Sequence, residues 1–123
     1  MEIIHLKPNH IDERGVITDL LQDETVNSVT MISFECGAVR ANHYHKYTYQ
    51  WNYVLSGAIK IITQLPGQEK VDMIMKKGDF VLTVPNERHA LIAVEPSDLL
   101  VLTKGPRSGE HYENDTFRLT TPL

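Results

Sequence analysis

The chain consists of short runs in which apolar and polar residues alternate, separated by turn-forming residues about every eight to twelve positions. The runs 29–34 and 47–55 have a period of two, which places alternate side chains on opposite faces of a strand. No segment carries apolar residues at helical spacing over the length that a stable helix needs. The pattern therefore predicts an all-β protein.

The expected strands, about ten in number, favour a jelly-roll barrel, that is, a double-stranded β-helix. Closing two sheets on each other removes the exposed strand edges that an open sheet would keep. We expect a single domain over residues 1–123, with its core at about 15–103. The polar tail at 104–123 is expected to wrap the outside of the barrel or to reach a partner subunit.

Composition and charge narrow the possible partners. With 41% hydrophobic and 23% charged residues among 123, the chain can fill one core. The formal net charge is -4 and the longest basic cluster is Lys76-Lys77, so we expect neither nucleic acid nor a membrane surface as a partner. The N-terminus has no leader pattern and no apolar stretch approaches ~18 residues, which predicts a cytoplasmic protein. The lone Cys36 is expected to be a packed strand residue.

The stretch GAVRANHYHKYTYQWNYVLSG at 37–57 carries candidate chemistry. His43 and His45 are two residues apart, so both imidazoles leave the same face of a strand. Gln50 follows on the next run, and His89 begins a further alternating run after a turn. Three imidazoles and one amide oxygen form a plausible ligand set for a divalent transition metal, whose identity stays open among Zn, Ni, Fe, Mn and Co. The alternatives are polar residues that only line a cavity, or one histidine acting as a general base without metal.

These residues resemble the motifs of the cupin superfamily. The first motif, G-x5-H-x-H-x(3,4)-E-x6-G, is matched in every spacing, with Gln in place of Glu, by Gly37, His43, His45, Gln50 and Gly57. The second motif, G-x5-P-x-G-x2-H-x3-N, keeps Gly78 and His89, with departures at Val84, Asn86 and Ala93. Asn86 suits a turn position that demands a positive φ, because Asn tolerates the left-handed region better than most residues. The resemblance implies a jelly roll with one pocket between its sheets.

A narrower resemblance links the chain to the RmlC-like sugar 3,4-ketoisomerase and WxcM-like group. The pattern R-G-x-H-x-H-K-x3-Q of that group is similar to the run from Arg40 to Gln50, with Ala41 where the group usually has Gly. Its Asp-x-Arg-Gly opening and acidic-Arg ending are similar to residues 12–15 and 112–118. His89 is a departure, because the ketoisomerases tend to lack this ligand. The group belongs to the biosynthesis of cell-surface polysaccharide sugars.

 

The resemblance to this group implies that the chain is an isomerase or epimerase. Its expected substrate is a small-molecule keto-sugar in nucleotide-linked form. His43 and His45 would serve catalysis and, with Gln50 and His89, hold the metal, which polarises the carbonyl while a pocket residue or water moves the proton. We expect Arg40 and Asn52 to bind the substrate, and the protein to be a homodimer. Two other functions stay open: a metal-dependent dioxygenase, and a non-catalytic cupin that binds or senses a small molecule.

The remaining candidates receive structural assignments. The aromatic residues Tyr47, Tyr49, Trp51 and Tyr53 lie on one strand face and are expected to pack within the sheet or at a dimer interface. Tyr44 should point away from the two histidines that flank it. Glu87 with Arg88 is expected to be a solvated loop pair. The other histidines are assigned to the surface: His5, His10 and His111.

Overall fold

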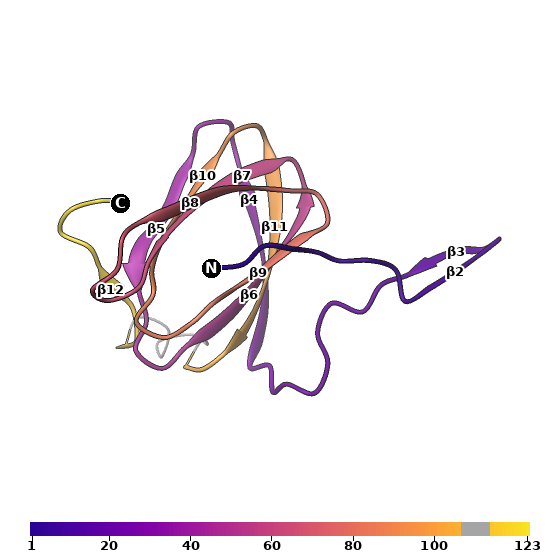
Figure 1. Ribbon diagram of the computed structural model, residues 1–123, viewed down its shortest axis with the longest axis horizontal. Coiled ribbons are helices and arrows are strands. Elements are labelled where there is room, and N and C mark those ends of the chain that lie inside the picture. The colour runs from indigo at the N-terminus through magenta and orange to yellow at the C-terminus, as the bar shows by residue number, and fades with distance from the viewer. Residues whose placement is uncertain (107–113) are drawn as a thin grey trace.

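The computed structural model describes residues 1–106 and 114–123, and most of its strands form two antiparallel sheets that face each other (Figure 1). The first sheet contains, in order across it, β1 (Ile4–His5), β9 (Asp79–Thr83), β6 (Tyr49–Ser56), β11 (Ser97–Lys104) and β4 (Ser28–Phe34). The second contains β12 (Phe117–Arg118), β5 (Val39–Tyr44), β10 (Arg88–Ala93), β7 (Ala58–Gln64) and β8 (Val71–Lys76). The predicted all-β jelly roll is confirmed.

The inward faces of the two sheets are apolar at one end of the barrel and polar at the other. The apolar end is a cluster of buried side chains made of Phe34, Val54, Ile59, Ile61, Met75, Val81, Leu91, Ala93, Leu99 and Val101. Further along the same strands the inward positions become polar, yet they stay buried: Gln50, Asn52, Thr63, Thr83, His89 and Thr103. Buried polar side chains need partners or a ligand, so this polar end is where a functional site is expected.

The alternating residues of strand β6 lie on opposite faces of the first sheet. Its residues Gln50, Asn52 and Val54 point between the sheets, whereas Trp51 and Tyr53 point outward. Trp51 forms a second apolar cluster with Phe80 and Leu102, which is covered by partly buried residues that include Leu6 and Leu21 of the N-terminal segment. The structural assignment of the aromatic face therefore holds for Trp51 and Tyr53.

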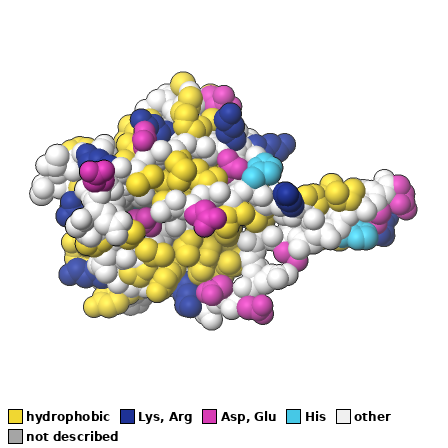
Figure 2. All heavy atoms as spheres, in the orientation of Figure 1, with side chains coloured by type: hydrophobic (Ala, Val, Ile, Leu, Met, Phe, Trp, Pro, Cys, Tyr) yellow, Lys and Arg dark blue, Asp and Glu magenta, His cyan; other side chains and the backbone are white. Residues whose placement is uncertain are grey.

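Both ends of the chain add to the structure outside the predicted core of 15–103. Strand β1 pairs with β9, and β12 pairs with β5, so the described part of the tail lies on the barrel as an edge strand. The hairpin of β2 (His10–Asp12) and β3 (Gly15–Ile17) projects away from the barrel as an arm (Figures 1 and 2). No helix in the described ranges is long and apolar enough to cross a membrane.

Two assignments from the sequence are wrong. Cys36 lies in the turn between β4 and β5 and is exposed, because the strand ends at Phe34 and the next residues reverse the chain. Glu87 is buried instead of solvated, because its Oε1 accepts a hydrogen bond from the Val84 backbone N–H at 3.1 Å across the turn that precedes β10. His5 and His10 are exposed as expected, whereas His111 lies outside the described residues.

Candidate metal centre

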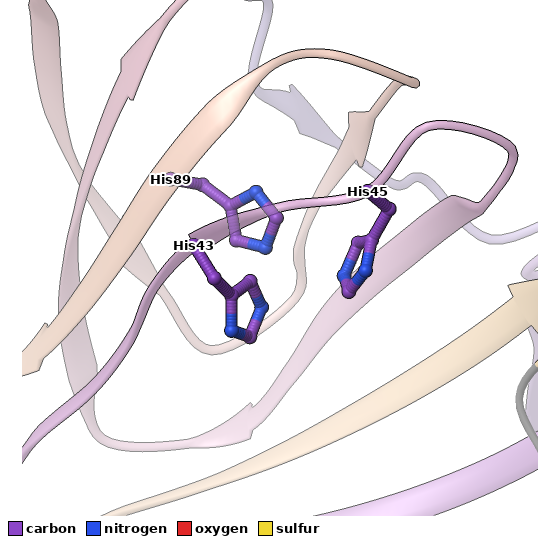
Figure 3. A group of neighbouring side chains, drawn as sticks. All are labelled: His43, His45 and His89. Carbon is purple, nitrogen blue, oxygen red and sulfur yellow. The ribbon is translucent and has the colours of Figure 1, made fainter. Parts of the chain in front are cut away.

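Three buried histidines meet at the polar end of the barrel. His43 on β5 and His89 on β10 are paired across the two strands, and His45 directly follows β5. The ring centroid of His43 lies 4.7 Å from that of His45 and 4.7 Å from that of His89. The ring centroids of His45 and His89 are 5.4 Å apart. One ring nitrogen from each of the three side chains lies within 4.8 Å of those from the other two, and Figure 3 shows the three rings close together.

A bulge in β5 aims His43 into the barrel. The register against β10 shifts by one residue, since His89 faces His43 whereas Ala90 faces Ala41, which leaves Asn42 as the extra residue. Ala41 and Asn42 have φ values of 70° and 57°, in the left-handed region. Bulges of this kind redirect side chains beside functional sites, and a left-handed Ala is strained. The Gly that ketoisomerases usually carry at this position would adopt the same conformation without that strain.

The hydrogen bonds of His45 and His89 indicate which nitrogen of each ring can act as a ligand. The His45 Nδ1 donates to the Asp115 backbone carbonyl at 2.7 Å, and the His89 Nδ1 donates to the Glu87 carbonyl at 3.0 Å. A carbonyl oxygen only accepts, so each neutral imidazole keeps its lone pair on Nε2. Histidine ligands in metalloproteins are oriented in this way by a backbone carbonyl.

His89 stays neutral well below neutral pH. Its burial lowers the pKa to about 4, since the charged form would lose its hydration, and the nearby His45 lowers it further. The hydrogen bond to Glu87 opposes this shift without cancelling it. A neutral imidazole is the form that binds a metal ion.

Gln50 brings a fourth possible donor atom to the histidine cluster. Its Oε1 lies 3.2 Å from the His45 Nε2, and its side chain is buried on β6. With the proton of His45 on Nδ1, two electron-rich atoms face each other, an arrangement that a bound cation would stabilise. Three imidazole nitrogens and one amide oxygen are donors that suit a divalent transition metal. Nitrogens that bind one ion at about 2.1 Å lie at most about 4.2 Å apart, so atoms that now lie within 4.8 Å of one another would move closer together on metal binding.

His43 and His89 lie in the wall of a cavity of about 300 Å³. Its polar lining includes His43, His89, Gln50 and Asn52, and its apolar lining consists of Ile32, Ala41, Leu91 and Val101. Two arginines, Arg40 and Arg118, complete the described lining, which contains no Asp or Glu. Two guanidinium groups without a carboxylate make this cavity suited to an anionic ligand.

The predicted substrate-binding residues occupy different depths of this cavity. Asn52 is buried, and its Nδ2 donates to the backbone carbonyls of Gln50 and Val81, so the amide oxygen is the group it can offer a ligand. Arg40 is exposed, and its Nη2 donates to the Ser33 carbonyl at 3.1 Å while the guanidinium lies 5.3 Å from the Phe34 ring centre. Tyr44, for which the sequence predicts a side chain directed away from the histidines, is not among the described lining residues and stacks on Phe117.

Sequence reasoning missed Asp115 and Arg118 as parts of this site. In the strand register, Arg118 lies opposite His43, and His43 lies opposite His89. The three residues therefore form one row across β12, β5 and β10. Asp115 is buried beside the site, and although desolvation raises its pKa, hydrogen bonds from Thr48, Lys46 and Tyr47 outweigh that effect and lower it. Both residues fall within the ketoisomerase-like ending of the sequence, but no spacing rule brings that ending to the histidines.

The fold and the histidine cluster agree with the comparisons of sequence. Residues 30–103, more than half of the chain, match the family model described as "Cupin domain". The chain belongs to the cupin family. The predicted membership is confirmed, and the match spans both histidine-bearing motifs.

Individual relatives add detail about what the chain resembles. It is 28% identical over 79 residues to the pectin degradation protein KdgF of Dickeya dadantii (strain 3937), a match that covers 64% of this chain and 67% of that protein. The QdtA sugar 3,4-ketoisomerase from Thermoanaerobacterium thermosaccharolyticum, in complex with TDP, superposes with a TM-score of 0.78 at 21% identity, covering 97% and 88% of the two chains. The WlaRB TDP-quinovose 3,4-ketoisomerase from Campylobacter jejuni gives 0.80 at 19% identity, covering 96% and 92%. The fold resembles that of RmlC-like ketoisomerases.

Proposed function

We propose that this cupin is a metal-dependent isomerase of an anionic keto-sugar. The observation that carries the proposal is the convergence of three buried imidazoles and Gln50 in a cavity that also holds two arginines and, among its described lining residues, no carboxylate. Solved structures with this fold include 3,4-ketoisomerases, and a curated relative acts in pectin degradation, so sugar chemistry is the shared theme of the relatives.

The metal would be held by His43, His45, His89 and Gln50. A divalent ion in this set supplies a Lewis acid for a carbonyl oxygen and for the negative charge that develops on it. All four donors are neutral, so the ion would keep its full charge, and the site would attract anions more strongly than one with a carboxylate ligand.

The other cavity residues would bind and orient the sugar. Arg40 and Arg118 would hold its anionic group, since a guanidinium matches the geometry of a carboxylate or phosphate. The Asn52 amide oxygen would accept a hydrogen bond from a hydroxyl group. The apolar wall formed by Ile32, Leu91 and Val101 would exclude water from the reacting carbons.

Isomerisation requires a proton to leave a carbon beside the carbonyl and another to return. Because a histidine that binds a metal through its lone pair cannot also accept this proton, we assign the transfer to a water molecule in the cavity. If the protein proves to be free of metal, His43 or His45 would instead be the catalytic base.

The size of the cavity bears on the substrate. About 300 Å³ lies at the lower end of the range for ligand pockets, so it would hold a single sugar ring. For a nucleotide-linked keto-sugar, as in the ketoisomerases, the nucleotide would lie outside this cavity. A free acidic keto-sugar would place its carboxylate near the two arginines, and the similarity to a pectin degradation protein favours this second candidate.

We also propose that the protein is a cytoplasmic homodimer assembled through its arm. Ile11 and Val16 face each other across the hairpin and are 68% and 59% exposed. A two-stranded hairpin with exposed aliphatic side chains has little stability of its own in water, and a second copy of the chain would cover it.

Solvent deuterium exchange tests the proposed reaction. The metal-loaded protein should incorporate deuterium from D₂O into the carbon beside the carbonyl of an anionic keto-sugar, with TDP-linked and free acidic keto-sugars tested separately. His43→Ala should abolish the exchange, whereas His10→Ala on the arm should leave it unchanged. Oxygen consumption instead of exchange would indicate a dioxygenase, and binding without either would indicate a non-catalytic cupin.

A further inference from the structure

Asp115 holds the loop that connects the histidine-bearing strand to Gln50. Its Oδ1 accepts a hydrogen bond from the Lys46 backbone N–H at 2.8 Å. Its Oδ2 accepts from the Tyr47 N–H at 3.0 Å and from the Thr48 Oγ1 at 2.6 Å. The Asp115 side chain is only 3% exposed, so water offers these donors little competition. One carboxylate thus binds three successive residues of the loop.

The same residue also orients His45. The Asp115 backbone carbonyl accepts the hydrogen bond from the His45 Nδ1 at 2.7 Å, which directs Nε2 toward Gln50. On the other side, the Asn86 backbone N–H donates to the His45 carbonyl at 2.6 Å. His45 lies beyond the end of β5, so these contacts replace the strand pairing that fixes His43.

The rest of the C-terminal segment is attached independently of the Asp115 carboxylate. Phe117 stacks on Tyr44 at 5.3 Å, and the Lys46 Nζ lies 4.5 Å from the centre of the Phe117 ring. The Leu119 N–H donates to the Asn42 carbonyl at 2.9 Å. A change in the Asp115 side chain alone should therefore loosen the loop without detaching β12.

We propose that Asp115 is a positioning residue: its carboxylate fixes the loop at 46–48, and thereby holds its own carbonyl against the His45 Nδ1 so that His45 presents Nε2 to the site. The proposal does not require Asp115 to touch metal or substrate. It rests on the proposed metal site only for its effect on metal affinity, because the orientation of His45 can be measured without metal.

The test compares Asp115→Asn with Asp72→Asn, a matched control in which the carboxylate is exposed and pairs with Lys60. In Asp115→Asn an NH₂ group replaces one carboxylate oxygen. A hydrogen-bond donor then faces the N–H and O–H donors of the loop. In the metal-free wild type, ¹⁵N spectra of the imidazoles should show His45 protonated on Nδ1, and Asp115→Asn should convert this to a mixture of tautomers. Co²⁺ titration followed by visible absorption should show an affinity about ten- to a hundredfold weaker for Asp115→Asn.

Thr48→Val provides a milder variant in case Asp115→Asn does not fold, since it removes one of the three hydrogen bonds. It should weaken Co²⁺ binding by a smaller factor. If the wild type binds no Co²⁺, the proposed metal site fails and the ring spectra still test the positioning role. Unchanged His45 tautomers in folded Asp115→Asn, or in folded Thr48→Val if Asp115→Asn does not fold, would overturn the proposal.

Discussion

His43 and His89 are direct partners across β5 and β10, and their rings meet edge to face at 4.7 Å with an interplanar angle of 89°. The pairing joins two motifs that are far apart in the sequence. It depends on the bulge at Asn42, since without the extra residue the side chains after the bulge would change faces. The site is therefore built into the pairing of two strands.

Gln50→Glu should strengthen the binding of the metal and weaken the binding of anions. The variant adds a negative charge to a neutral donor set, so a divalent ion should bind more tightly and an anionic substrate more weakly. An added interaction of about 1.4 kcal/mol corresponds to a tenfold change, and we expect at least about this factor in the metal Kd. Calorimetric titration with Co²⁺ measures it. The exposed Gln68→Glu adds the same charge away from the site and should change the Kd little.

The stability of the metal-free protein should fall as the pH drops from about 6.5 to about 4. Above this window neither state protonates His89, whereas within it the unfolded chain binds a proton that the folded protein excludes by burial of the ring. The loss should approach roughly 3 kcal/mol from this residue and then level off. Urea denaturation as a function of pH measures it, and the loss should largely disappear in His89→Gln. An equally steep loss in that variant would rule out this explanation.

Ala41→Gly should stabilise the protein. Ala41 has a φ of 70°, where glycine avoids a cost of about 1–2 kcal/mol but brings extra entropy to the unfolded chain. The net gain should be roughly 0.5–1 kcal/mol in the free energy of unfolding. Ala38→Gly, at a residue outside the left-handed region, should instead destabilise. Chemical denaturation of both variants would contradict the assigned strain if Ala41→Gly were the less stable of the two.

The arm should control the oligomeric state. Ile11→Asp combined with Val16→Asp places charges on the exposed apolar face of the hairpin, and we expect the dimer to dissociate into folded monomers. Light scattering coupled to size exclusion measures the mass. Ile74→Asp, at a similarly exposed position on β8, serves as the control and should remain dimeric. A monomeric wild type would contradict the proposed dimer.

The sequence predicted the strands, the fold family and the four candidate ligands because each depends on local information. Alternation defined β4 and β6, and motif spacing brought His43, His45, Gln50 and His89 into one set. Even the turn at Asn86 has the expected positive φ, at 67°.

The residues that were misplaced depend on contacts between distant segments. Arg118 reaches the cavity because β12 pairs with β5, and Asp115 is buried because it binds the loop at 46–48. From its place in a polar turn, the sequence predicts a solvated Glu87. Its carboxylate is instead buried and accepts a hydrogen bond from a backbone N–H of that turn. No periodicity in the sequence indicates any of these contacts.

The metal content of the protein tests the central claim most directly. Protein purified without added metal should contain about one divalent transition-metal ion per chain by elemental analysis, and His43→Ala and His89→Ala should each lose it, whereas His10→Ala should retain it. A wild type that carries no ion, and whose melting temperature does not rise when Zn²⁺, Ni²⁺, Fe²⁺, Mn²⁺ or Co²⁺ is added, would contradict the claim.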